Sequence, residues 1–126
     1  MPQASLQTGT RATVTRSFTT GDIRHFHSLA GSIAADGDDR VPEPLIGALF
    51  SYLLGVELPG FGTNYLKQEM QFAAPARVGQ ALTATVEITR LRPDKHLADL
   101  ATTCTDAAGT VICHGRALVL VKDVGA

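Results

Sequence analysis

The hydrophobic residues of the segment 44–55, PLIGALFSYLLG, recur at steps of three and four, as they do along one face of an α-helix. Leu45 and Leu54 widen this apolar stripe until little of the predicted helix is polar. Pro44 suits the first turn, where a missing backbone N–H costs little, and Gly55 suits the left-handed position that ends many helices. Because a helix that is apolar nearly all round must be covered nearly all round, we expect the rest of the chain to enclose it.

Most of the chain after this helix alternates between apolar and polar residues, which is typical of half-buried β-strands. The pattern predicts strands at residues 11–18, 64–73, 81–90, 95–105 and 110–122. The unbroken apolar run at residues 117–121 predicts burial on both faces of the last strand. Since the helices precede most of the strands and do not alternate with them, we predict an α+β fold, in which a curved antiparallel sheet wraps around the central helix.

A shorter helix is predicted before the central one. Thr19 or Thr20 can cap it, and Asp22 in its first turn suits the positive end of the helix dipole. One face of this helix carries Ile23, Phe26, His27 and Ala30. Gly31 ends the pattern, and residues 32–41 are small, acidic and without periodicity, which is typical of a loop.

With 126 residues the chain is long enough for one domain, which we assign to residues 11–126 after a flexible tail of residues 1–10. The formal net charge is −1 and no basic cluster stands out, so we expect neither nucleic acid nor a membrane as a partner. No apolar run is long enough to span a bilayer, and the N-terminus lacks the apolar region of a signal peptide. We therefore expect a cytoplasmic protein.

Cys104 and Cys113 lie on either side of a turn predicted at Ala108 and Gly109, where they can face each other across a hairpin. In a reducing compartment we expect two free, partly buried thiols. His114 adjoins Cys113 on the same strand and should point to the other face, so these residues do not form a metal site. We expect no cofactor.

Several spaced motifs resemble the MaoC-like hot-dog family. TTGDIRHFHSLAG is similar to the first helix of these proteins, and LLG, LPGFGT, QEMQF and PARVGQ match the end of the central helix, the connector, the next strand and its turn. Gln80 stands where that turn usually has Asp. The resemblance implies a hot-dog fold, and an (R)-specific enoyl-CoA hydratase or 3-hydroxyacyl-thioester dehydratase activity. It further implies an acyl group presented by CoA or a carrier protein, and a homodimer or a heterodimer with another hot-dog chain that binds this group between its subunits.

The chain departs from the family where its catalytic Asp-x-x-x-x-His motif should stand. Without gaps, Ser32 and Gly37 occupy these two positions, and residues 28–95 contain no histidine. The usual His-Gly pair at the start of the central helix is replaced by Pro42 and Glu43. In the family a backbone N–H at this helix start polarises the thioester carbonyl. The resemblance therefore implies an atypical site that lacks the usual acid–base pair.

Four residues are candidates for replacing this pair: His27, Asp36, Asp38 and Glu43. An imidazole paired with Asp36 or Asp38 can orient and activate a water. Alternatively, these aspartates belong to a solvated loop, His27 fills space, and Glu43 only complements the helix dipole. The candidates for substrate binding are Pro44, Gly47, Tyr52 and Tyr65, although aromatic residues at these spacings also suit a core.

Three functions follow from this sequence. The first is a hydratase or dehydratase that acts on an acyl thioester or a similar conjugated carbonyl compound at a rearranged site. The second is a hot-dog thioesterase in which Glu43 or Asp38 activates water. The third is a non-catalytic hot-dog subunit or acyl-ligand binder, which the missing Asp/His motif also fits.

Overall fold

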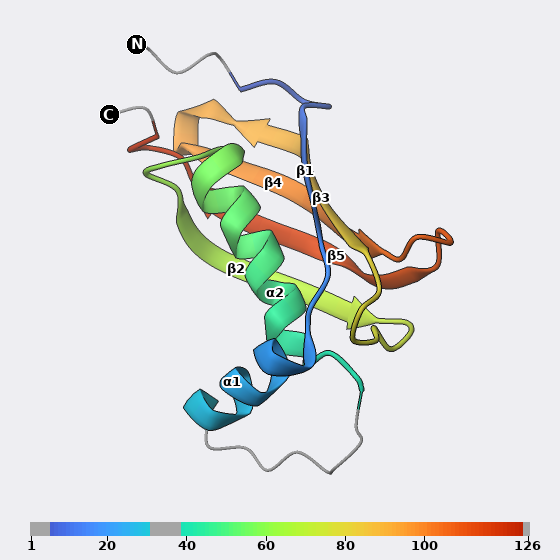
Figure 1. The fold of residues 1–126 in the computed structure, drawn as a ribbon. Helices are drawn as coiled ribbons and strands as arrows, with labels where there is room; N and C mark the ends of the chain where they lie inside the picture. Colours follow the sequence, from blue (N-terminus) through green and yellow to red (C-terminus); the bar gives the residue numbers. More distant parts are fainter. Residues whose placement is uncertain (1–5, 31–38, 125–126) are drawn as a thin grey trace.

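Five antiparallel strands form one curved sheet in the computed structural model, which describes residues 6–30 and 39–124 (Figure 1). In chain order the strands are β1 (Arg11–Arg16), β2 (Asn64–Phe72), β3 (Leu82–Arg92), β4 (Leu97–Thr105) and β5 (Val111–Leu120). Their order in the sheet is β1-β3-β4-β5-β2, so β1 and β2 are the two edges. The predicted α+β architecture is confirmed.

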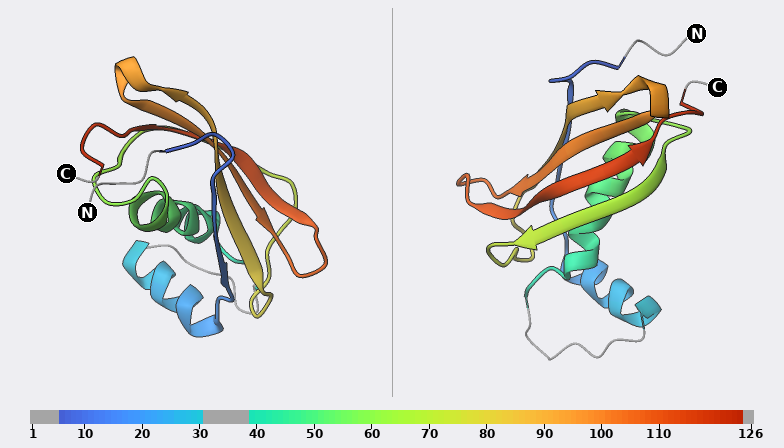
Figure 2. Two further views of the ribbon diagram at one scale, coloured as in Figure 1. Left: turned by 90° about the horizontal axis from the view of Figure 1, so that it is seen from above. Right: turned by 180° about the vertical axis from the view of Figure 1, so that it is seen from behind.

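The central helix, α2 (Glu43–Tyr52), lies against the concave side of this sheet (Figure 2). Ile46, Leu49 and Phe50 bury its inner face. The predicted end at Gly55 is wrong by two residues, because a π-helical turn (Leu53–Glu57) continues the helix. The N–H of Leu58 donates to the carbonyl of Leu53 at 2.7 Å and closes this wider turn.

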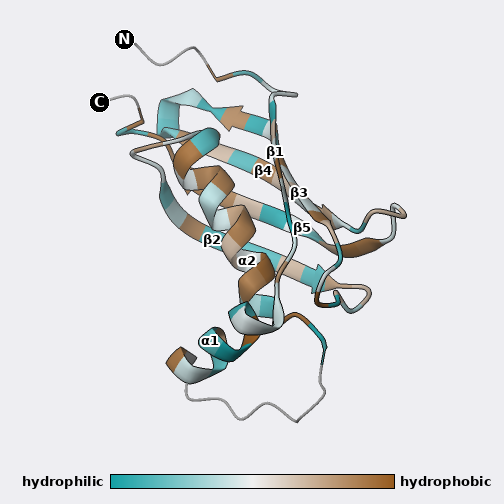
Figure 3. Ribbon diagram, in the orientation of Figure 1, coloured by the Kyte–Doolittle hydropathy of each residue, from teal (hydrophilic) through white to brown (hydrophobic). Residues whose placement is uncertain are grey.

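The prediction that α2 is covered nearly all round is wrong for one side of the helix. Pro44, Ala48, Ser51 and Tyr52 are exposed, and Tyr52 keeps 47% of its surface open. Figure 3 shows that α2 is mainly hydrophobic along its length, while the sheet covers only the side that faces it. The hydrophobic pattern of α2 therefore predicts burial for a side of the helix that is in fact exposed.

The first helix, α1 (Thr20–Ala30), follows β1 and lies beside the start of α2 (Figure 1). Thr19 and Asp22 cap it reciprocally: the N–H of Thr19 donates to Asp22 Oδ2 at 2.8 Å, and the N–H of Asp22 donates to Thr19 Oγ1 at 3.1 Å. The predicted cap is thus confirmed. These two bonds lower the pKa of Asp22 from its ordinary value.

Burial alternates strictly along β4 and from Leu82 to Ile88 of β3, and the inward residues belong to the same hydrophobic core as α2. The predicted burial of residues 117–121 on both faces is wrong, because Ala117 and Val119 are buried while Leu118 and Leu120 are only partly so. Cys104 and Cys113 are direct partners in the β4–β5 register, and both are buried and free. The expected free thiols are confirmed, and both are fully buried where partial burial was expected.

The described part of the predicted tail is attached to the sheet. The N–H of Gly9 donates to the carbonyl of Ile88 at 2.8 Å, and the N–H of Ile88 donates to Thr10 at 3.0 Å. These bonds extend the β1–β3 pairing toward the N-terminus. Residues 1–5 lie outside the described residues.

Candidate active site

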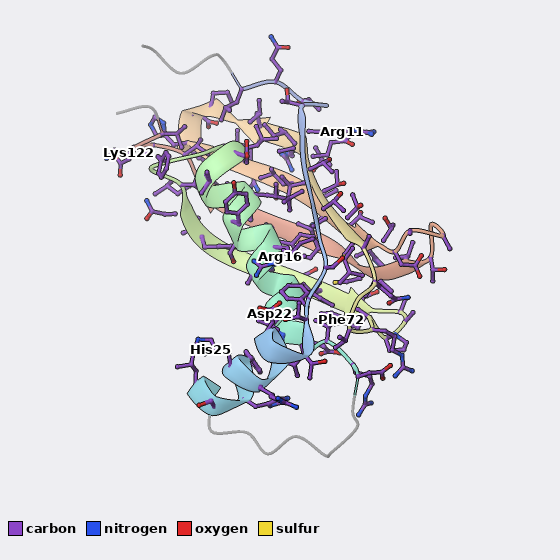
Figure 4. The ribbon with its side chains drawn as sticks, viewed as in Figure 1. Arg11, Arg16, Asp22, His25, Phe72 and Lys122 are labelled. Carbon is purple, nitrogen blue, oxygen red and sulfur yellow. The ribbon has the colours of Figure 1, made fainter. Side chains whose placement is uncertain are left out.

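A cavity of about 470 Å³ opens at the start of α2, and we call it the helix-start cavity. Its walls come from α1, the segment that enters α2, α2 itself, and the end of β2 with the loop that follows: His27, Arg40, Val41, Pro42, Glu43, Ile46, Phe72, Ala73, Ala74, Pro75 and Ala76. Figure 4 shows Phe72 beside the junction of α1 and α2, while His25 points outward from α1. The cavity therefore joins residues that are far apart in the chain.

The segment that enters α2 is held by the loop between β2 and β3. The N–H of Val41 donates to the carbonyl of Ala76 at 2.8 Å, and the N–H of Val78 donates to the carbonyl of Asp39 at 2.7 Å. Arg77 Nη1 also lies 2.6 Å from Asp39 Oδ1. These contacts fix the approach to α2, so Glu43 starts the helix at a defined place.

His27 lies on the side of α1 that faces this cavity, as the helical spacing predicts. Its ring packs edge-to-face against Phe26 with the centroids 5.5 Å apart. Nδ1 of His27 is buried and has no hydrogen-bond partner among the described residues. Because a buried polar nitrogen without a partner costs about 1–3 kcal/mol, this atom needs a water, a ligand or a further side chain.

Glu43 is the first residue of α2, and its side chain is exposed. The position suits a carboxylate, since the backbone N–H groups at a helix start carry partial positive charge. Burial raises the pKa of the Cys113 thiol to about 11, and the negative charge of Glu43 contributes to that rise. The Glu43 carboxylate is therefore close enough for its charge to disfavour ionisation of this thiol.

A second cavity of about 590 Å³ runs between the open side of α2 and β2, and we call it the edge groove. Glu43 and Phe72 line both cavities, so the two are neighbours. The remaining walls of the edge groove are small or flexible residues: Pro44, Gly47, Ala48, Ser51, Gln68 and Met70. The arrangement offers polar groups at one end and a long apolar wall beside them.

Two of the four candidate catalytic residues, His27 and Glu43, meet at the helix-start cavity. Asp36 and Asp38 lie outside the described residues, so their role stays a prediction. Of the candidate binding residues, Pro44 and Gly47 line the edge groove. Tyr52 instead lines a separate groove of about 370 Å³ between β1, α1 and α2.

Tyr65 lies near the far end of α2. Its hydroxyl forms a hydrogen bond with Ser51, which itself lines the edge groove. Burial raises the pKa of Tyr65 to about 12, and the bond to Ser51 offsets a part of that rise. Tyr65 therefore supports the wall of the groove through Ser51.

The sequence reasoning missed several residues that line these cavities, and two of them carry long polar side chains. Arg40 lines the helix-start cavity, and Gln68 lines the edge groove. Their positions depend on how the β2–β3 loop and the edge strand fold back on α2. The alternation of β2, which turns Gln68 to the same side as Met70 and Phe72, was the available signal for the second residue.

An (R)-specific enoyl-CoA hydratase from Aeromonas caviae is 34% identical to this chain over 131 residues, which are 94% of the chain and 98% of that relative. The chain belongs to the MaoC-like (R)-specific enoyl-CoA hydratase family. An (R)-specific enoyl-CoA hydratase from Rhodospirillum rubrum is 43% identical to the present chain over 87 residues, which are 68% of the chain. That match spans only 60% of the relative's own length. No family model matches the chain.

Solved structures agree with this assignment. The (R)-hydratase from Aeromonas caviae superposes on this MaoC-like chain with a TM-score of 0.85 at 34% identity, covering 91% of the chain and 96% of that structure. The unliganded R-hydratase PhaJ1 from Pseudomonas aeruginosa gives a TM-score of 0.84 at 27% identity, covering 94% and 84%. The predicted hot-dog fold is confirmed. None of the described helices is long and apolar enough to cross a membrane.

Proposed function

We propose that this chain is a hydratase that adds water across the double bond of 2-enoyl-CoA thioesters, and catalyses the reverse dehydration. The observation that carries the proposal is that His27 and Glu43 line one cavity at the start of α2. Nδ1 of His27 finds no hydrogen-bond partner in the described part of the chain, which leaves this imidazole free to bind a water, a ligand or a further side chain. The 34% identical hydratase from Aeromonas caviae supports the choice of reaction.

In this mechanism Glu43 accepts a hydrogen bond from the attacking water and orients it. His27 takes a proton from the water as its oxygen bonds to C3 of the substrate. The electrons of the double bond move toward the thioester oxygen, where the backbone N–H of Glu43, the first residue of α2, would stabilise the enolate. The imidazolium then returns the proton to C2, so that one water is added and His27 is neutral again.

The proposal also assigns a carboxylate partner to His27, which would be either Asp36 or Asp38. A carboxylate that accepts a hydrogen bond from one imidazole nitrogen fixes the tautomer and makes the other nitrogen a better base. The pair would then replace the Asp-x-x-x-x-His arrangement that Ser32 and Gly37 interrupt. Asp36→Asn and Asp38→Asn identify the partner, since only one of these changes should reduce turnover.

The test is the hydration of crotonyl-CoA, followed by the loss of its conjugated absorbance. We expect His27→Gln to lower kcat by about 10²-fold or more, as loss of a general base does, and Glu43→Gln to lower it to a smaller extent. His25→Gln is the matched control, because His25 is exposed on the same helix. No turnover by the folded wild-type chain, or equal activity of the His25 and His27 variants, contradicts the proposal.

The alternative is a non-catalytic acyl-CoA binder, which the absence of histidine from residues 28–95 favours. Calorimetry with butyryl-CoA separates the two, because a binder shows affinity for the saturated thioester without hydration of crotonyl-CoA. Release of free thiol from the same substrates instead identifies a thioesterase, and its persistence in Glu43→Gln excludes Glu43 as the base.

The same proposal includes a homodimer in the cytoplasm. The open side of α2 and the unpaired edge of β2 border the edge groove, so a second chain would cover both. A heterodimer with another hot-dog chain is the competing assembly, and native mass spectrometry of the purified chain tests whether it dimerises alone. The free thiols of Cys104 and Cys113, adjacent in register, suit a reducing compartment.

A further inference from the structure

The side of the sheet that is turned away from α2 (Figure 2) has a cavity of about 310 Å³, which the mechanism above does not use. We call it the outer-face hollow. Its charged side chains come from four strands: Lys67, Arg90, Arg92, Arg116, Glu69 and Asp99. Four cations against two carboxylates give the hollow a formal charge of +2, although the whole chain carries −1. The fold therefore assembles a positive cluster that no single stretch of the sequence shows.

The strand register places the centre of this hollow in one row across the sheet. Arg90 on β3 is opposite Asp99 on β4. Leu118 on β5 is opposite both Asp99 and, on its other side, Lys67 of β2. Since neighbouring strands lie about 4.8 Å apart, the Cα atoms of Arg90 and Lys67 are roughly 14 Å apart. The row thus has one cation at each end and an aliphatic side chain between them.

Two register shifts turn these end cations to the outer face. The pairing of β3 with β4 shifts between Ile88 and Arg90, so that Thr89 and Arg90 both line the hollow. In a regular strand Arg90 would instead share the inner face with Ile88, which is fully buried. The pairing of β2 with β5 shifts at Leu66 in the same way, immediately before Lys67. Bulges re-aim side chains, and here two of them direct a cation into the same row.

Glu69 is the carboxylate that serves Lys67 and Arg116. Its Oε1 lies 3.3 Å from Lys67 Nζ, and its Oε2 lies 3.5 Å from Arg116 Nε. All three side chains are about half exposed or more, so these ion pairs are weak and screened by solvent. One carboxylate between two cations leaves a positive charge over, and both cations keep N–H donors for a further acceptor.

The two arginines of β3 also keep unused donors. Arg92 Nη2 lies 2.8 Å from Asp99 Oδ2, while Nε of Arg92 is buried and has no hydrogen-bond partner in the described part of the chain. Arg90 is exposed and forms no ion pair with any residue in the described ranges 6–30 and 39–124. A guanidinium presents a rigid fork of N–H groups that matches the oxygens of a phosphate. The row is therefore suited to an anion rich in acceptor oxygens.

We propose that the outer-face hollow binds a ligand with two linked phosphate groups, which spans the row from Arg90 to Lys67. One phosphate meets one end of this row, whereas two linked phosphates meet a cation at each end and cross Leu118 between them. The net positive charge of the hollow attracts such a polyanion. Because the hollow and the helix-start cavity lie on opposite faces of the sheet, this ligand is a separate molecule from the thioester substrate.

Calorimetric titration of the whole chain with pyrophosphate at low ionic strength tests the proposal. We expect a Kd below about 1 mM, which Arg90→Gln should weaken about tenfold or more, because it removes both the charge and the fork of donors. Arg90→Lys keeps the charge without the fork and should lose less affinity. Arg24→Gln is the matched control, since Arg24 is an exposed arginine on α1, and it should bind as the wild type does.

A second variant adds a charge to the middle of the row. Leu118→Glu places a carboxylate between Arg90 and Lys67 and should weaken pyrophosphate binding by a similar factor. Titration with ADP separates two sources of the diphosphate group: a lower Kd for ADP than for pyrophosphate identifies a nucleotide, and the reverse identifies the free anion.

Competition with butyryl-CoA distinguishes a separate ligand from the substrate, whose CoA also carries a diphosphate. We expect excess butyryl-CoA to leave pyrophosphate binding unchanged. Three results overturn the proposal: no binding of pyrophosphate by the wild type, an equal loss in Arg24→Gln and Arg90→Gln, or displacement of pyrophosphate by butyryl-CoA. None of these titrations requires hydratase turnover, so an inactive protein that binds pyrophosphate as expected contradicts only the proposed function.

Discussion

His27 illustrates what a single residue position can reveal. The helical spacing of α1 correctly predicts that His27 faces inward, and the structure sets it in a cavity with Glu43. Arg40 escaped prediction because its place depends on the bonds between residues 39–41 and the β2–β3 loop. Local periodicity reports the side of an element on which a residue lies, but long-range pairing decides what it meets there.

The paired cysteines lead to a prediction about alkaline stability. Burial raises the pKa of Cys104 and of Cys113 from 9.0 to about 11. In the unfolded chain these thiols ionise first, so the stability they contribute is complete below about pH 9 and falls as the pH rises to about 11. The free energy of unfolding, measured by urea titration from about pH 8 upward, should fall more steeply in the wild type than in the Cys104→Ala/Cys113→Ala variant.

The slope is the measurement that matters in this comparison, because the alanines also leave a cavity that lowers stability at every pH. Tyr65, whose pKa is about 12, adds a further loss above about pH 10 that both proteins share. Parallel curves for the two proteins between about pH 9 and pH 11 would contradict the burial of the thiols.

At the scale of elements, the sequence predicted both α-helices and all five strands, but it misjudged what covers them. The run at residues 117–121 and the central helix are both apolar enough for complete burial, yet each keeps one side partly open. Hydropathy measures the preference of a segment for burial, whereas coverage depends on the number of other elements available. A sheet with one helix layer cannot cover both its own outer face and the far side of α2.

The close approach of β2 and β5 gives a prediction at the same scale. A Cβ atom on Gly115 would collide with the carbonyl oxygen of Glu69 and lie 3.0 Å from the Cα of Met70. Gly115→Ala should therefore push β2 away from β5 and cost about 1–3 kcal/mol in the free energy of unfolding. Chemical denaturation measures this loss.

Gly55→Ala is the control, since no atom lies within 4 Å of its added Cβ. Alanine in this helical turn should leave stability unchanged or raise it by up to about 1 kcal/mol. If Gly115→Ala is as stable as Gly55→Ala, the backbone of β2 does not lie as close to β5 as this fold requires.

At the scale of the whole molecule, the order of the sheet could not be deduced from the chain alone. The family resemblance supplied the hot-dog arrangement, while the residues themselves gave only antiparallel strands and a central helix. That arrangement makes β2 an edge and brings it beside the start of α2, which creates both the helix-start cavity and the edge groove. Alternation along β2 indicates the side on which Gln68 lies, but only this placement brings Gln68 into the edge groove.

Because ligand and folding are linked, occupation of the edge groove should raise the thermal stability of the whole chain. Butyryl-CoA at a concentration about 100 times its Kd should add about 2.7 kcal/mol to the free energy of unfolding. Ser51→Phe fills the edge groove from the open side of α2 and should abolish the rise in Tm, whereas Ala107→Phe, at an exposed turn away from the groove, should retain it. Differential scanning fluorimetry measures the Tm of each variant with and without butyryl-CoA. An equal rise in Tm in both variants would mean that the acyl group binds elsewhere. The groove between β1, α1 and α2, which Tyr52 lines, would then be the next surface to block.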